Sequence, residues 1–331
     1  MRIPFLDGFL ASMLIAIAIA LLAPQLGASG GVLHLEQVTM VGVAIVFLLS
    51  GAGLSPAKLK AGAANWRLHL FVQLFTFAVF PLLGLAVVGL AGRWLPQELA
   101  LGFFYLCALP STVSSSIAMT ALARGNIAAA VFNATLSSLI GMVLTPLYIS
   151  LWLQAASHGV PLADQLIKIG EQLLLPFVVG QILRPLIGDW VAAHKHVTGK
   201  VDRGVIVLIV FNSFCDATAA GVWTRYGVAP LLATALLTGG LLGFVLWLTH
   251  LVATRFRFTV EDEITAVFCG SKKSLATGAP MAALIFGASS GGALGLIMLP
   301  IMVYHQLQLI VCSVIARRYA QRPETAAAPD I

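Results

Sequence analysis

Charged side chains are scarce in this sequence. Only 10% of its 331 residues are Asp, Glu, Lys or Arg, whereas 59% are hydrophobic. A soluble domain carries about 25% charged residues, and a chain with so few cannot cover a water-exposed surface. The composition therefore excludes an ordinary soluble domain and indicates that the lipid bilayer is the solvent for most of the chain.

Cysteine is scarce as well. The four cysteines, Cys107, Cys215, Cys269 and Cys312, fall inside apolar segments, and their spacing matches neither a zinc site nor a disulfide framework. We expect buried, inert thiols. The sequence also lacks a phosphate-binding loop, a metal cluster and a nucleotide motif, so we predict no cofactor and no enzyme.

Basic residues outnumber acidic ones and give a net charge of +6. A nucleic-acid-binding protein gathers such charge on one face, but here it lies in short runs between apolar stretches. That distribution is typical of membrane topology. We therefore exclude nucleic acid as a partner.

Apolar runs long enough to cross a bilayer recur along the chain. A spanning helix needs about 20 apolar residues. We place ten spans between the Gly, Pro and charged clusters, near residues 8–25, 38–55, 66–91, 97–122, 127–153, 165–187, 203–222, 229–254, 263–287 and 292–317. An even number of spans puts both termini on one side of the membrane.

The basic residues outside the spans are distributed unequally. Three of them, Arg93, Lys168 and Arg225, fall at the ends that face away from the termini. On the side of the termini lie fourteen, namely Arg2, Lys58, Lys60, Arg67, Arg124, Arg184, Lys195, Lys200, Arg203, Arg255, Arg257, Arg317, Arg318 and Arg322. Since basic residues stay in the cytoplasm, we predict a multi-pass cell-membrane protein, in the inner or plasma membrane, with both termini cytoplasmic.

The longest polar connection, residues 188–203, divides the chain into two sets of five spans. An odd number of spans makes the second set enter the membrane in the opposite sense, as in the inverted repeats of secondary transporters. We therefore expect helices 1–6 in residues 1–187, a cytoplasmic loop over 188–203, and helices 7–10 in residues 204–322. The tail, residues 323–331, is predicted to be disordered.

Polar clusters interrupt the fourth and ninth spans at matching places. Each contains small polar residues and a proline, which favours a helix broken halfway with its backbone free to bind a solute. We expect residues 110–116 and 270–278 to be non-helical and adjacent at mid-membrane. The alternative is that the hydroxyls bond their own helix or a neighbour. The candidate binding residues here are Ser111, Thr112, Ser114, Ser115, Ser116, Ser271, Lys272, Lys273 and Ser274.

Lys272 and Lys273 are the most unusual residues in the chain. A lysine near the bilayer centre costs on the order of 3 kcal/mol, so each needs an anionic partner or a polar cavity. We expect at least one of them to face the polar core between the two domains rather than lipid, the alternative being that a lysine extends to the membrane surface. Asp216 is the acidic candidate, although it could instead lie near the outer surface beside Arg225.

Four further polar residues fall at membrane depth. Asn133 and Ser137 are four residues apart and share a helix face. Gln73 and His305 lie in the third and tenth spans. We add all four to the candidate substrate or ion site, although a lone histidine such as His305 more often serves helix packing.

At these positions the sequence resembles the bile acid:sodium symporter family. The resemblance covers nearly the whole chain and rests on the order and spacing of several segments: Ser50–Leu54, Pro110 through Asn126, Thr145-Pro146, Tyr304-His305-Gln306, and Phe268–Gly278. The last segment is similar to the divergent branch that includes the seventh human member. The resemblance implies two inverted five-helix repeats arranged as panel and core domains, broken fourth and ninth helices, and sodium-coupled symport of an organic anion.

The family's ion ligands are only partly present. By resemblance, Ser115 and Ser116 match sodium ligands on the fourth helix. Ala130 and Ala134 replace the hydroxyls of the fifth, leaving Asn133 and Ser137 as substitutes. The ninth-helix glutamate is replaced by Phe268, and Lys272 stands in place of a glutamine. Two interpretations follow. Sodium symport could use the remaining oxygens with Asp216, or Lys272 could replace an ion in a sodium-independent or proton-coupled transporter.

Two other functions stay open at this stage. A regulatory membrane protein could keep the fold without transport. An intramembrane hydrolase would use Ser271 or Ser274 beside a lysine, but the sequence offers no water pathway for it. The G-x-S-x-G pattern at residues 287–291 is not a nucleophile elbow, because it falls in a turn between two spans. The sequence names neither the substrate nor the oligomeric state.

Overall fold

The computed structural model describes residues 8–30, 34–54, 65–156, 162–286 and 293–322, and this part of the chain contains helices but no strands. The helices of the first half are α1 (Gly8–Leu22), η1 (Pro24–Leu26), α2 (Leu35–Gly53), α4 (Trp66–Leu74), η2 (Phe75–Val79), α5 (Phe80–Ala91), η3 (Gly92–Trp94), α6 (Gln97–Ala108), α7 (Ser114–Leu122) and α8 (Ile127–Ala156). Those of the second half are α9 (Leu162–Ala193), α10 (Lys195–Ala219), α11 (Val222–Tyr226), α12 (Ala229–Arg255), α13 (Val260–Gly270), α14 (Leu275–Phe286) and α15 (Leu294–Ala320).

Six helical segments of the described residues are long and apolar enough to cross a membrane. They are Leu35–Gly53, Trp66–Trp94, Ile127–Gln154, Leu174–Ala193, Ala229–Arg255 and Leu294–Ala320. Apolar helices of this length are stable in the hydrocarbon core of a bilayer, whereas in water their apolar faces would be exposed. The chain is therefore a polytopic α-helical membrane protein. This confirms the class predicted from composition, while the number of ten spans stays a prediction.

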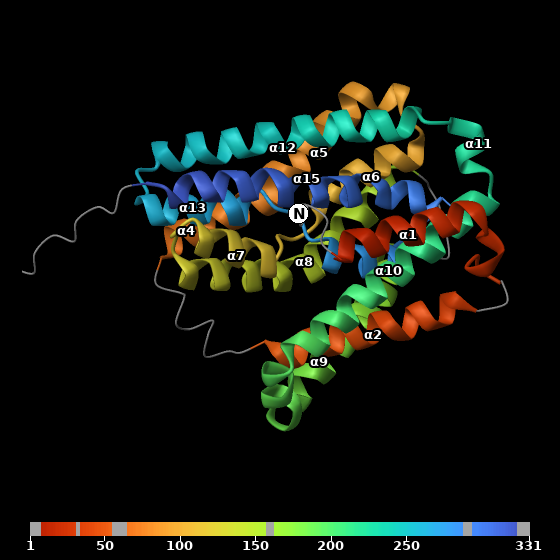
Figure 1. Ribbon diagram of the computed structural model, residues 1–331, viewed down its shortest axis with the longest axis horizontal. Helices are drawn as coiled ribbons and strands as arrows, with labels where there is room; N and C mark the ends of the chain where they lie inside the picture. The colour runs from red at the N-terminus through yellow and green to blue at the C-terminus, as the bar shows by residue number, and fades with distance from the viewer. Residues whose placement is uncertain (1–7, 31–33, 55–64, 157–161, 287–292, 323–331) are drawn as a thin grey trace, which may run out of the picture.

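The helices form two groups. The four-helix group consists of α1, α2, α9 and α10, in which α2 packs along α9 and α1 packs along α10. The crossing group contains α4–α8 and α12–α15, with α6 against α5 and α15, and α12 against α13 and α15. Figure 1 shows α2 and α9 side by side below the crossing group, with α10 running from them toward it.

The predicted loop over residues 188–203 is wrong in its local structure. Helix α9 continues to Ala193 and α10 begins at Lys195, with only His194 between them. The polar residues of this segment lie on the exposed ends of two helices that turn sharply into each other, so polarity here marks a helix end that leaves the apolar interior rather than a loop.

Other predictions have simple outcomes. All four cysteines are free and buried, which confirms the expectation of inert thiols. The tail 323–331 and the G-x-S-x-G pattern at 287–291 lie outside the described residues.

Glycines let α2 and α9 approach closely. A Cβ atom at Gly180 would overlap the carbonyl oxygen of Leu48, and one at Gly51 would overlap that of Phe177. Small residues at such contacts let membrane helices pack backbone to backbone. The close packing of α2 against α9 therefore requires glycine at these two positions.

We expect Gly180→Ala to destabilise the protein by about 1–3 kcal/mol, because the added methyl group must push two backbones apart. The matched control is Gly243→Ala in α12, where nothing lies within 4 Å of the added atom. Thermal unfolding in detergent, followed by a dye that reacts with the exposed thiols, compares them. Equal stability of both variants would contradict this packing.

Candidate functional site: a crossing of two broken helices

Both predicted interruptions are present. Helix α6 ends at Ala108, just before Pro110, which has no N–H to continue the helical hydrogen bonds. Residues 109–113 are not helical, and α7 begins at Ser114. Likewise α13 ends at Gly270, residues 271–274 are not helical, and α14 begins at Leu275. The breaks are shorter than predicted, since Ser114–Ser116 and residues 275–278 are helical.

The two breaks contact each other directly. The Ser274 backbone N–H donates to the Pro110 carbonyl over 2.9 Å. The Ser111 hydroxyl donates to the carbonyl of Cys269 over 2.6 Å, and that of Ser116 to the carbonyl of Phe268 over 3.2 Å. The predicted adjacency of the two segments is confirmed, and we call this region the crossing.

Side chains from neighbouring helices take up the backbone groups that the breaks leave free. The Tyr304 hydroxyl donates to the carbonyl of Ser271 over 2.7 Å, and the Thr145 hydroxyl donates to that of Ala108 over 2.8 Å. The Ser137 hydroxyl accepts from the Ser111 N–H over 2.9 Å. Because buried backbone groups need partners, these bonds hold the crossing in one conformation.

Gln308 was missed by the sequence reasoning. Its side-chain oxygen accepts from the Lys273 N–H over 2.9 Å, and its amide donates to the Lys273 carbonyl over 2.8 Å. His305, a predicted candidate, contacts the Gln308 amide through Nδ1 at 3.0 Å. It therefore helps to orient Gln308 for its two bonds to the Lys273 backbone. The available signal was a buried glutamine in an apolar helix, one turn after Tyr304.

Lys273 is fully buried and its ammonium group is held by three backbone carbonyls. Its Nζ donates to the carbonyl oxygens of Thr76, Cys107 and Leu109 over 3.0, 2.8 and 2.6 Å. The ammonium also lies 4.0 Å from the centroid of the Phe80 ring, a cation–π distance. All three donors of the ammonium are therefore used.

The π-helical turn η2 explains why the Thr76 carbonyl is available. The Phe80 N–H bonds to the carbonyl of Phe75, five residues back. The next residue, Pro81, has no N–H. The Thr76 carbonyl thus has no partner in its own helix, and such π-turns are frequent at functional sites.

The end of α6 supplies the other two carbonyls. The Ser111 N–H would bond to the Cys107 carbonyl in a continued helix, but it is bonded to Ser137 instead. The last carbonyls of a helix carry the negative end of its dipole, which favours a cation. The Lys273 ammonium therefore fills a carbonyl-lined position of the kind that binds a small cation.

Lys272 is also fully buried, yet its ammonium has fewer partners. Its Nζ donates to the Ser115 carbonyl over 2.8 Å and lies 5.3 Å from the Phe268 ring. Neither lysine pairs with a carboxylate among the described residues. Neither lysine faces lipid or extends to the surface, as expected. The prediction that one of them faces the polar core between the two domains is wrong, because the partners of both ammonium groups belong to the crossing group.

Asp216 does not provide the predicted counter-charge. Its carboxylate accepts from the N–H and the hydroxyl of Ser29, over 2.6 and 2.8 Å. It lies one turn before the end of α10, which ends at Ala219. The neighbouring connection after η1 offers donors that satisfy it, so the alternative of an end position is supported.

The hydroxyls of the first break bond among themselves. Thr112 Oγ1 lies 2.6 Å from the hydroxyl of Ser115 and 2.9 Å from that of Ser116. In the second break the Ser271 hydroxyl donates to the Val267 carbonyl, and Ser274 Oγ accepts from the Thr277 N–H. Most of these hydroxyls are thus structural in this conformation. This supports the alternative that they bond to their own helix or to a neighbouring one.

Asn133 and Gln73 form a separate polar cluster. The Asn133 amide lies 3.0 Å from His69 Nδ1, and its oxygen accepts from the Gln73 amide over 3.3 Å. Asn133 is therefore engaged by α4, whereas Ser137, one turn later, contacts the crossing. The pair predicted to act together is divided between two places.

One cavity lies beside the crossing, and a second adjoins it within the four-helix group. The crossing cavity, about 500 Å³, is lined by Gly53, Leu54, Val113, Ser114, Ile117, Ala118, Val131, Phe132, Thr135 and Lys195. These residues come from both helix groups, so the cavity lies between them. Ser114, a predicted candidate, is exposed toward it.

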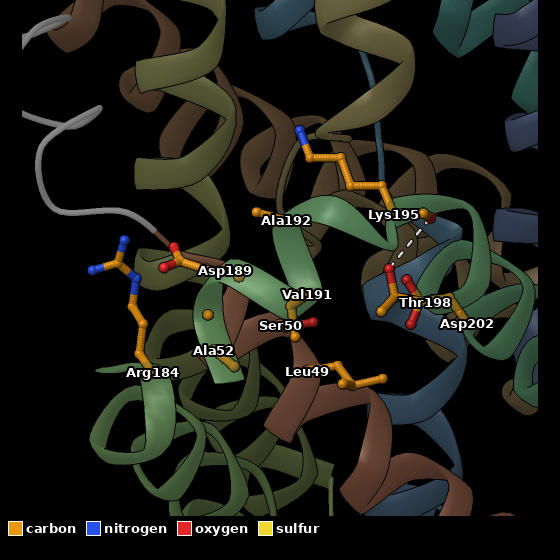
Figure 2. A pocket seen from close by; sticks show the side chains of 12 residues that line it. Leu49, Ser50, Ala52, Arg184, Asp189, Val191, Ala192, Lys195, Thr198 and Asp202 are labelled. Carbon is orange, nitrogen blue, oxygen red and sulfur yellow. Dashed lines mark hydrogen bonds between the residues drawn. The ribbon is translucent and has the colours of Figure 1, made fainter. Parts of the chain in front are cut away.

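The second, four-helix cavity, about 400 Å³, is lined by Leu49, Ser50, Ala52, Gly53, Arg184, Gly188, Asp189, Val191, Ala192, Lys195, Thr198 and Asp202. In Figure 2 the Lys195 side chain runs away from Asp202 and Thr198. Asp202 precedes the predicted span 203–222, and burial raises its pKa to about 6. Gly53 and Lys195 line both cavities.

The sequence has relatives among known proteins. Residues 7–321 match the family described as SBF-like CPA transporters. The chain belongs to this family. It is a membrane transporter family rather than a family of enzymes, which confirms the resemblance found in the sequence and the prediction that the chain is not an enzyme.

Relatives match over nearly the whole length. Protein PA2026 of Pseudomonas aeruginosa is 46% identical over 322 residues, covering 97% of this chain and 95% of the relative. YfeH of Escherichia coli is 42% identical over 96% of this chain and 94% of its own. The mouse sodium/bile acid cotransporter 7 is 33% identical over 93% of this chain and 91% of its own. The predicted relation to a divergent branch is thus confirmed.

Proposed function

We propose that this protein is a sodium-independent secondary transporter of a small organic anion, in which the Lys273 ammonium takes the place of a coupling sodium ion. The observation that carries the proposal is the set of three carbonyls around Lys273 Nζ, at 2.6–3.0 Å. Carbonyl oxygens from broken helices are what coordinates sodium in transporters built on such crossings.

The architecture supports transport by alternating access. Helices α1 and α10 and the two broken helices, α6–α7 and α13–α14, add four crossings to the six long segments. Ten spans would put both termini on one side of the cell membrane, and the distribution of basic residues favours the cytoplasmic side. If one helix group rocked against the other, a solute in the cavity between them would be exposed first to one side of the membrane and then to the other.

The charge of the crossing favours an anionic solute and disfavours sodium. Two buried ammonium groups without a carboxylate partner leave a net positive interior among the described residues. The mouse relative's name refers to sodium and bile acid, and sodium symport was the expectation drawn from the family resemblance. Here the carbonyl of Ser115, itself a predicted sodium ligand, accepts from Lys272, so a sodium ion would meet an ammonium.

Currents across a solid-supported membrane test the proposal. Proteoliposomes are exposed to concentration jumps of a panel of monocarboxylates and bile acids, in sodium or in choline buffer. We expect carboxylate-dependent transport currents of equal size in both buffers. Currents that require sodium would restore sodium symport, and the absence of current for every anion would contradict the proposed sodium-independent anion transport.

A further inference from the structure

The crossing lysines cannot serve as the binding partner of an anion in the crossing cavity. Both side chains are fully buried, and neither lines that cavity. The three donors of Lys273 are bonded to carbonyls. An anion that enters between the two helix groups therefore needs a cation from elsewhere.

Lys195 is the residue that offers one. Among the described residues that line the crossing cavity, it alone is charged, while the others are apolar, glycine or hydroxyl-bearing. It is the first residue of α10, and its backbone carbonyl accepts from the Thr198 hydroxyl over 3.3 Å. Its side chain is exposed rather than bonded into the helix.

We propose that Lys195 binds the charged group of the substrate and makes the crossing cavity selective for a monovalent organic acid with an apolar body. The inference rests on the proposed transport of an anion and names its specificity-determining residue. A cation would be repelled by Lys195, and a dianion would find no second cation among the described residues of the lining. The apolar body would lie against Val113, Ile117 and Phe132.

The position of Lys195 between two cavities suggests a path for the anion. The four-helix cavity contains Asp189 and Asp202 as well as Arg184, so its lining is of mixed charge. An anion that moves past Lys195 leaves the crossing cavity, where the only charged residue described is a cation, and enters the four-helix cavity, whose lining includes two carboxylates. This difference would favour release on the side of the four-helix cavity.

Thiol chemistry in the crossing cavity measures the charge directly and needs no substrate. Ser114→Cys places a thiol in its lining, and the native cysteines are all buried. The full-length protein in neutral nanodiscs is treated with a negatively charged and a positively charged methanethiosulfonate of similar size. Each rate is divided by the rate with a free thiol, which corrects for intrinsic reactivity.

We expect the negative reagent to react faster at Ser114→Cys, and the added substitution Lys195→Gln to reduce this preference on the order of tenfold. The matched control is Lys200→Gln, which removes an exposed charge from the same helix but lines neither cavity. We expect it to leave the preference unchanged. Equal preferences in both variants, or an unreactive Ser114→Cys, would overturn the assignment.

A charged and a neutral compound of one shape test the ligand class. We expect 4-phenylbutyrate to slow modification of Ser114→Cys and its neutral amide to protect less, with the difference lost in Lys195→Gln. Equal protection by both, or by neither, would contradict selectivity for an acid. These assays measure the resting protein, so they can fail while sodium-independent transport stands, or succeed while it falls.

Discussion

Lys273→Met should destabilise the protein by on the order of 5 kcal/mol, more than any other single substitution at the crossing. The ammonium satisfies the carbonyls of Thr76, Cys107 and Leu109, and methionine cannot donate to them. Each buried group left without a partner costs about 1–3 kcal/mol. The apparent Tm from thermal unfolding of the purified protein measures the effect.

Lys272→Met is the matched control, because the same substitution one residue earlier removes a bond to a single carbonyl. We expect it to lower the apparent Tm by less than half as much. If both variants unfold at the same temperature, the carbonyls around Lys273 are not what its ammonium stabilises.

Lys272→Gln should leave the protein folded but change its dependence on cations. An ammonium repels a sodium ion at 4 Å by about 4 kcal/mol at an effective dielectric constant of 20, nearly three decades in affinity. Glutamine can still donate to the Ser115 carbonyl but adds no charge. We therefore expect transport in this variant to be lost or to become sodium-dependent, with an apparent Tm close to that of the wild type.

Transport currents in sodium and in choline buffer, recorded for the wild type, Lys272→Gln and Lys200→Gln, decide this. Lys200 is exposed on α10 and lines neither cavity, so its variant controls for the loss of one positive charge. Unchanged currents with unchanged ion dependence in Lys272→Gln would mean that Lys272 only fills space in the interior.

The sequence predicted the parts of this site that follow from the cost of polar groups in lipid. Two lysines in an apolar span cannot face hydrocarbon, so their burial was predictable without coordinates. The breaks before Ser114 and Leu275 followed from proline and small polar residues at matched places. Membrane-spanning character followed from composition alone.

The partners of those lysines were not predictable. We expected a carboxylate, Asp216, because opposite charge is what can be recognised in a sequence. The structure uses backbone carbonyls, one of them freed by a π-helical turn ahead of Pro81. Every residue has a carbonyl, so only the geometry shows which are left unpaired.

Lys195 was missed as a site residue for a related reason. In the sequence it is one of fourteen basic residues that indicate the cytoplasmic side, and the segment 188–203 reads as a polar loop. Because α9 and α10 turn into each other at His194, the following lysine lies beside two cavities instead. A charge count assigns the side of a membrane but cannot show what a side chain faces.

The response of the wild-type protein to sodium tests most directly whether Lys273 replaces a coupling ion. Purified protein is heated in choline chloride with increasing fractions replaced by sodium chloride at constant ionic strength. A ligand that binds the folded state stabilises it by RT ln(1 + [L]/Kd). The account predicts no change in the apparent Tm between choline and sodium, whereas a saturable, sodium-specific rise would show that the crossing binds the ion and contradict it.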